Sequence, residues 1–127
     1  MVEWEFVDAL AAEFEGCKFI DGKDKPTSPM REWCLNGKAV AWERPLSKKD
    51  LAAMRESAPK GRVMAVHMPD LLTRDAWVQT VPGPCFVSPH FAKYPAVLVD
   101  MELADEQLVR ELFDDGVLAA TANERKG

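Results

Sequence analysis

Residues 33–42 read WCLNGKAVAW, and this stretch decides the fold of the chain. Two apolar runs, 33–35 and 38–42, are separated by the dipeptide Asn36-Gly37. Asn and Gly both tolerate a positive φ, which the two central positions of the tightest hairpin turn require. The stretch therefore predicts a β-hairpin whose second strand ends before Pro45.

The sequence before this hairpin predicts a helix and then a loop. Apolar side chains recur at helical spacing, at Trp4, Val7, Ala11 and Phe14. This pattern predicts an amphipathic helix that ends near Gly16. The stretch 21–30 is rich in turn-forming residues and predicts an exposed loop.

The sequence after the hairpin alternates helices with short apolar runs. Ser47 and Asp50 have the spacing of a capping box, which predicts a helix over 47–58. A second helix is expected over 70–80, and Asp105 caps a third. The apolar runs between them predict strands over 62–67, 85–88 and 96–99, the last two joined by a short loop as a second hairpin.

The resulting order, α-β-β-α-β-α-β-β-α, predicts one α+β domain. We expect a mainly antiparallel sheet made of two hairpins and one further strand, with helices packed against it. A chain of 127 residues has the size of one domain. We place the core of the domain within 3–115 and expect a mobile tail over 116–127. A single hydrophobic core is expected to contain Trp33, Trp42, Phe86, Val97, Leu98, Leu108 and Leu112.

The net charge of −5 is spread unevenly along the chain. Residues 1–17 and 63–127 are acidic, and residues 18–62 carry an excess of Lys and Arg. The middle third is therefore the part that would attract a polyanion. No window approaches the ~20 apolar residues of a membrane span, and the acidic N-terminus lacks the layout of a secretory signal. We expect a cytoplasmic protein with reduced, mostly buried cysteines and no membrane partner.

Two blocks of sequence resemble the MmcQ/YjbR family. Residues 33–46 are similar to that family's first hairpin, and residues 88–99 look like its late hairpin, which contains a histidine. The likeness runs in order over roughly residues 3–115. It implies a compact α+β domain of a kind often labelled DNA-binding, with a winged arrangement. The chain departs from the family where relatives tend to carry a basic end, because it has Asp114-Asp115-Gly116 there.

The sequence lacks the motifs that are typical of common enzyme classes. There is no Gly-rich phosphate loop, no HExxH, no paired CxxC and no GxSxG in the chain. Cys85 follows Pro84 on a predicted strand and is interpreted as a core residue, and His67 as a structural histidine. We therefore expect a non-enzymatic protein that uses no metal and no cofactor.

The residues best placed to bind a ligand are basic and aromatic. A proline-flanked loop presents His90, Lys93 and Tyr94, and a basic run extends from the first hairpin into the helix after it. Lysines neutralise phosphates and aromatic rings stack on bases, so DNA is the expected partner. The candidate contact residues are Lys38, Arg44, Lys48, Lys49, His90, Lys93 and Tyr94. They can converge only if the two hairpins lie at the same edge of the sheet, as two wings would.

Three alternatives stay open from the sequence. Phe91 and Tyr94 could fold inward and anchor the late hairpin instead of contacting a ligand. The acidic helices could form the surface of a protein-interaction domain with a protein partner. An enzyme of unrecognised type could be centred on His90, which would then need a second perturbed group beside it.

Overall fold

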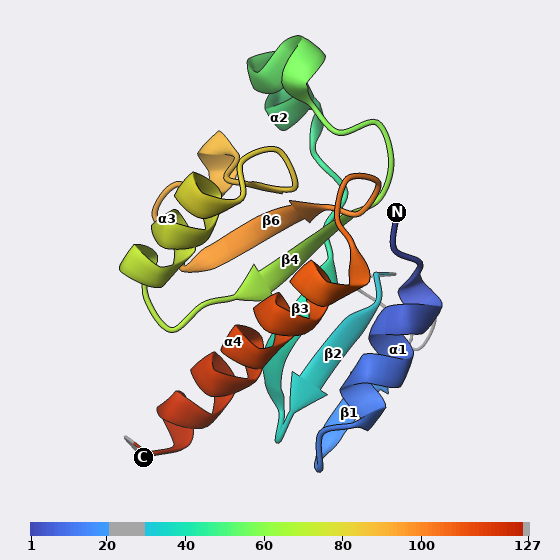
Figure 1. Ribbon diagram of the computed structural model, residues 1–127. Helices are drawn as coiled ribbons and strands as arrows, with labels where there is room; N and C mark the ends of the chain where they lie inside the picture. Colours follow the sequence, from blue (N-terminus) through green and yellow to red (C-terminus); the bar gives the residue numbers. More distant parts are fainter. Residues whose placement is uncertain (21–29, 126–127) are drawn as a thin grey trace.

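The computed structural model describes residues 1–20 and 30–125, which form one compact α+β domain (Figure 1). Within these residues a six-stranded sheet has the order β1-β2-β3-β4-β6-β5, and each neighbouring pair is antiparallel. The strands are β1 (Cys17–Ile20), β2 (Glu32–Leu35), β3 (Lys38–Glu43), β4 (Val63–His67), β5 (Cys85–Phe86) and β6 (Ala96–Asp100). The predicted fold class is confirmed. All of the loop predicted over 21–30, except Met30, lies outside the described residues.

Three helices cover one face of this sheet, which we call the helical face. They are α1 (Trp4–Ala12), α3 (Leu71–Thr80) and α4 (Glu106–Arg125). Figure 1 shows α4 running diagonally across the sheet, between α1 and α3. The short α2 (Lys48–Met54) continues into the 3₁₀ turn η2 (Arg55–Ser57) and stands beyond the end of β3, where it contacts a second 3₁₀ turn, η3 (Pro89–Phe91).

Local sequence signals explain most of these elements. Asn36 and Gly37 have φ values of 52° and 82°, as the predicted two-residue turn requires. The Ser47 hydroxyl accepts a hydrogen bond from the Asp50 N–H at 3.1 Å, and the Asp50 side chain completes the capping box. The Asp70 carboxylate caps α3 in the same way. These predictions are confirmed, although α2 ends at Met54 and not at 58.

The hydrophobic core is divided between the two faces of the sheet, so the prediction of a single core is wrong. Successive residues of a strand point to opposite faces. Val97 therefore packs in the large cluster of the helical face, with Trp33, Leu108 and Leu112. Leu98 packs on the opposite face, which we call the second face, in a smaller cluster with Val63, Ala65, Phe91 and Ala96, with Trp42 and Phe86 against it.

The predicted tail begins inside helix α4 in the part that the structure describes. Helix α4 does not end at 116 but continues to Arg125, and Ala119 and Ala120 are buried. Gly116 lies where α4 crosses β3. A Cβ at this position would lie 2.8 Å from Val40 Cγ1 and 2.9 Å from the Val40 carbonyl oxygen. The glycine therefore allows the close approach of helix and strand that continues the core beyond residue 115.

Replacing Gly116 with Ala is expected to lower the free energy of unfolding by about 1–3 kcal/mol, because the added methyl group meets backbone and a buried side chain. Helix propensity alone predicts the opposite sign, a gain of about 1 kcal/mol. Urea unfolding measures the change. Gly61→Ala is the matched control, since its methyl group would meet only the flexible Glu102 side chain. A Gly116→Ala protein as stable as the wild type would contradict this packing.

Candidate functional site

Two segments far apart in the sequence meet on the second face of the sheet. Arg44 directly follows β3, and its guanidinium carbon lies 5.2 Å from the centre of the Phe91 ring in η3. The Arg44 Nη1 also donates a hydrogen bond of 2.7 Å to the Pro45 carbonyl. Phe91 is buried in the small cluster of this face, with Leu46 against the same cluster. The end of the first hairpin and the loop of the second hairpin are therefore in contact.

Tyr94 lies at the centre of an aromatic group on this face. Its ring stacks on His67 at 6.2 Å and meets Trp42 and Phe91 edge-on at 6.4 and 5.7 Å. Phe91 is 8% exposed whereas Tyr94 is 47% exposed. Phe91 therefore anchors the loop to the core, as one interpretation of the sequence expects, whereas Tyr94 presents part of its ring to solvent.

Arg74 fixes the backbone of this loop. Its side chain is buried, and its Nη1 donates hydrogen bonds to the carbonyls of Phe91, Ala92 and Tyr94 at 3.0, 2.9 and 3.0 Å. Nε and Nη2 donate to the Asp75 carboxylate at 3.0 and 2.8 Å. Arg74 was not predicted as a functional residue. An arginine within a helix is usually an exposed, charged side chain, and the sequence does not show which groups it bonds.

A cavity of about 460 Å³ opens beside Trp42. Its lining combines the indole of Trp42 with the acidic residues Glu32 and Glu43 and with the basic residues Arg31 and Arg44. The Arg31 N–H donates to the Glu43 carboxylate at 3.3 Å, and the Cys34 thiol donates to the Glu32 carboxylate at 3.3 Å. The lining of this cavity therefore combines an aromatic ring, two carboxylates that already accept hydrogen bonds, and two arginines.

The remaining predicted site residues do not all lie near this loop. Lys48 and Lys49 are exposed in the first turn of α2, which contacts η3, and Lys93 is exposed next to Tyr94. The side chain of His90 lies outside the described part of the chain. Lys38 is separate: it begins β3 whereas Arg44 follows its end, and six extended residues span about 20 Å.

The expectation that the two hairpins share an edge of the sheet is wrong. Strand β4 lies between them, because it pairs with β3 on one side and with β6 on the other. The hairpins come together on the second face instead, through Arg44 and Phe91. This arrangement joins Arg44 to the loop of residues 88–95 and leaves Lys38 at the far end of its strand.

Cys85 is a core residue, as predicted. It is buried on β5 in the large cluster, and burial raises the pKa of its thiol to about 12. A thiol with such a pKa stays protonated at neutral pH and is a poor nucleophile. Cys85 therefore cannot supply the second perturbed group that an enzyme centred on His90 would need.

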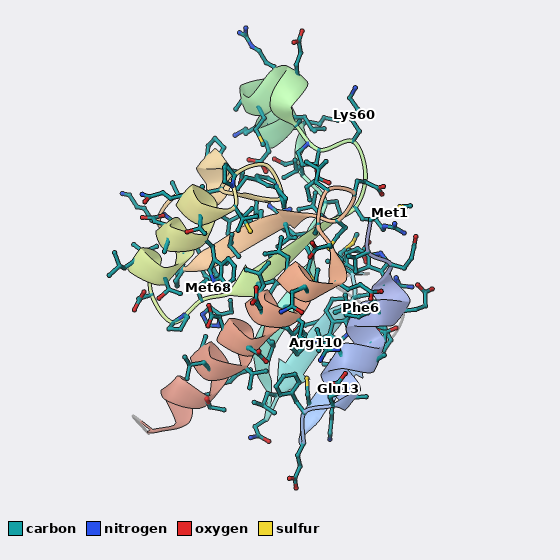
Figure 2. The ribbon with its side chains drawn as sticks, viewed as in Figure 1. Met1, Phe6, Glu13, Lys60, Met68 and Arg110 are labelled. Atoms are coloured by element: carbon teal, nitrogen blue, oxygen red, sulfur yellow. The ribbon has the colours of Figure 1, made fainter. Side chains whose placement is uncertain are left out.

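The acidic residues of the first helix make contacts inside the molecule. Asp8 accepts a hydrogen bond from Trp33 Nε1 at 2.9 Å, and Glu3 pairs with Arg62. Glu13 pairs with Arg110 at 2.9 Å, and Figure 2 shows the two side chains facing each other between α1 and α4. The hydrogen bond from Arg110, with the attraction of its positive charge, holds the pKa of Glu13 below its ordinary value. Much of the acidic surface of α1 thus tethers the helix to the domain.

None of the helices that the structure describes is both long and apolar enough to cross a membrane. No family model matches the sequence, and no solved structure matches it significantly.

Three mycobacterial proteins do match. The uncharacterized proteins Rv2570 and MT2646 of Mycobacterium tuberculosis (strains H37Rv and CDC 1551) and Mb2600 of Mycobacterium bovis are each 38% identical to this chain over 89 residues. The matched region is 65% of this chain and 69% of each relative. This identity over most of both partners shows common descent, and the chain belongs to the family of these mycobacterial proteins.

Proposed function

We propose that this protein is a small, non-enzymatic DNA-binding module of the MmcQ/YjbR type, which acts in the cytoplasm and holds DNA weakly through the second face of its sheet. The observation that carries the proposal is the contact between Arg44 and the loop that presents Tyr94. It places a guanidinium over the buried ring of Phe91, and the half-exposed ring of Tyr94 meets Phe91 edge-on. Arginine bonds phosphate oxygens and aromatic rings stack on bases, so the pair suits a nucleic acid.

The lysines near this face extend the proposed interface. Lys48 and Lys49 lie on α2, against the 3₁₀ turn of the loop, and Lys93 lies in the loop itself. We leave Lys38 out of the interface because it lies at the opposite end of β3. The acidic residues beside Trp42 and the net charge of −5 oppose long-range attraction. The affinity should therefore stay near the non-specific range, with Kd about 10⁻⁴ to 10⁻⁶ M at physiological salt.

The alternative of a protein-interaction domain has less support. It relies on the acidic helices, and Glu3, Asp8 and Glu13 already bond to Arg62, Trp33 and Arg110. A partner that binds this surface would compete with contacts that hold α1 in place. On the second face Arg44 also bonds within the molecule, to the Pro45 carbonyl, whereas Lys48, Lys49 and Lys93 are exposed.

Reversing Lys48 and Lys49 to Glu is expected to abolish binding to a fluorescently labelled DNA. Each lost phosphate contact makes the slope of log K against log salt shallower, by about 0.9 on duplex DNA and about 0.7 on a single strand. Fluorescence anisotropy at two salt concentrations measures both the affinity and this slope.

The matched control reverses Lys18 and Lys38 to Glu, which changes the net charge by the same amount at the other end of β3. This control should keep both the salt slope and most of the affinity. Equal losses in the two double variants would show that only net charge matters. If the wild type binds neither duplex nor single-stranded DNA at low salt, the proposed function is wrong.

A further inference from the structure

One arginine of the second face is fixed in place by contacts that leave its charge unpaired. The Arg44 guanidinium carbon lies 5.2 Å from the centre of the buried Phe91 ring, and Nη1 donates to the Pro45 carbonyl at 2.7 Å. The backbone is fixed as well, since the Arg44 N–H donates to the Val63 carbonyl of β4 at 2.9 Å. A ring and a neutral carbonyl therefore orient this guanidinium, and neither of them neutralises it.

The other nitrogens of this guanidinium are open to a ligand. Among the described residues Arg44 forms no ion pair, although Glu43 precedes it, and its Nε and Nη2 donate to no protein group. The buried nitrogens without a partner do not include these two, so both reach solvent. In contrast, a carboxylate pairs with each of Arg62, Arg74 and Arg110.

Arg74 shows within the same molecule what such a guanidinium binds. Its Nη1 donates to backbone carbonyls, and its Nε and Nη2 form a fork that holds an oxygen of the Asp75 carboxylate. Arg44 has the carbonyl contact but lacks the carboxylate. The planar fork of arginine matches the two free oxygens of a phosphodiester as well as those of a carboxylate, with charge-assisted hydrogen bonds. A phosphate of the proposed DNA ligand therefore fits Arg44 as Asp75 fits Arg74.

The lysines of this face suit a different kind of contact. Lys48, Lys49 and Lys93 are exposed, and an ammonium group on a flexible stem acts as a point charge without a preferred direction. These lysines attract the DNA backbone in many orientations. Arg44 is already oriented, so it loses less conformational entropy when it binds. A single oriented guanidinium among mobile ammonium groups is suited to fix where one phosphate lies.

We infer that Arg44 anchors the DNA backbone through a bidentate contact to the two free oxygens of one phosphate, and that Phe91 is the positioning residue that orients this guanidinium. The inference rests on the proposed function. It adds the contact that fixes the ligand, and a residue that acts through Arg44 without touching the ligand. Phe91 is 8% exposed, so its own ring is not open to a base.

The first experiment separates the fork from the charge, with fluorescence anisotropy of a labelled DNA duplex at several salt concentrations. Arg44→Lys keeps the charge and loses the fork, so the affinity should fall about five- to tenfold while the slope of log K against log salt stays the same. Arg44→Met loses both, so the slope should also become shallower by about 0.9. Arg110→Lys, on the helical face, is the matched control and should leave the affinity unchanged.

A double-mutant cycle tests the positioning role of Phe91. Phe91→Leu keeps an apolar side chain in the second-face cluster and removes the ring beneath the guanidinium. It should weaken binding about three- to fivefold in the wild type and have almost no effect in the Arg44→Lys protein, which has no fork to orient. Urea unfolding checks that each variant is folded, and Phe91→Met takes the place of Phe91→Leu if the latter is not.

The outcomes distinguish this inference from the proposed function. An Arg44→Lys protein that binds as tightly as the wild type would overturn the anchoring contact, while binding that is lost on reversal of Lys48 and Lys49 would still support the DNA-binding module. Equal losses from Phe91→Leu in both backgrounds would show that Phe91 acts through the loop, which overturns its positioning of Arg44. If the wild type binds no DNA at low salt, the proposed function fails and the inference fails with it.

Discussion

Replacing Arg74 with Met is expected to lower the free energy of unfolding by about 3–5 kcal/mol. Methionine keeps much of the length of the side chain but donates no hydrogen bond. The carbonyls of Phe91, Ala92 and Tyr94 would each lose a charged donor. Hydrogen bonds to charged groups contribute about 1.5–3 kcal/mol each, and three bonds to one nitrogen add up to less than their sum.

Equilibrium unfolding in urea measures this loss, and Arg110→Met is the matched control. Arg110 also pairs with a carboxylate, that of Glu13, but both side chains are about half exposed. Exposed ion pairs contribute roughly 0–1 kcal/mol, so the control should lose less than about 1 kcal/mol. If Arg74→Met and Arg110→Met lose the same amount, the loop of residues 88–95 does not depend on Arg74.

The role of Arg74 connects stability to the proposed function. The loop carries Lys93 and Tyr94, and Arg74 fixes the carbonyls on both sides of Lys93. A loop that is already ordered binds a ligand without a further loss of conformational entropy. An Arg74→Met protein that is still folded should therefore bind DNA more weakly than the wild type, although Arg74 is not among the proposed contact residues.

Local chemistry explains why so much of the fold could be predicted from the sequence. A turn of Asn36-Gly37, a capping box at Ser47 and an Asp70 cap each act over four residues or fewer. Such signals are complete within the sequence itself, and the structure confirms all three. Strand β1 was missed because its four residues, Cys17–Ile20, carry no turn or cap of this kind and are defined by their pairing with β2.

The candidate site depends on long-range contacts, which the sequence does not display. The loop with Tyr94 could be predicted because two prolines frame polar and aromatic residues. The partners of that loop could not, since Trp42 and Arg74 lie 52 and 20 residues before Tyr94. The same reason applies to Lys38 and Arg44: both carry positive charge on one hairpin, and only the direction of β3 separates them.

The core is divided between two faces because successive residues of a strand point to opposite sides and β6 is covered on both sides. A strand covered on both faces reads as a continuous apolar run, as residues 96–99 do, so the sequence shows burial without showing which cluster each side chain joins. The pairing of β6 with β4 and β5 sets the faces. Val97 and Leu98 then contribute to different clusters, and a substitution can test the smaller one by itself.

Replacing Leu98 with Ala is expected to lower the free energy of unfolding by about 2–5 kcal/mol, the range for removing a large buried aliphatic side chain. Leu98 is fully buried in the second-face cluster and pairs with Ala65 on β4 and with Phe86 on β5. The cluster is small, so few neighbours are available to fill the cavity, and the loss should lie in the upper part of this range. Phe91 packs in the same cluster, so the loop of residues 88–95 is anchored to the core beside Leu98.

Two measurements test this second cluster. Urea unfolding gives the global loss, and Leu72→Ala is the control, since Leu72 is 80% exposed and its truncation should change stability by less than about 0.5 kcal/mol. Amide hydrogen exchange reports on the loop: in Leu98→Ala the amides of Phe91 and Tyr94, which donate to the Ser88 and Phe91 carbonyls, should exchange faster. A global loss below 1 kcal/mol would show that Leu98 is not in a closed core. Unchanged exchange at these amides, with a large global loss, would show that the loop is held by Arg74 alone.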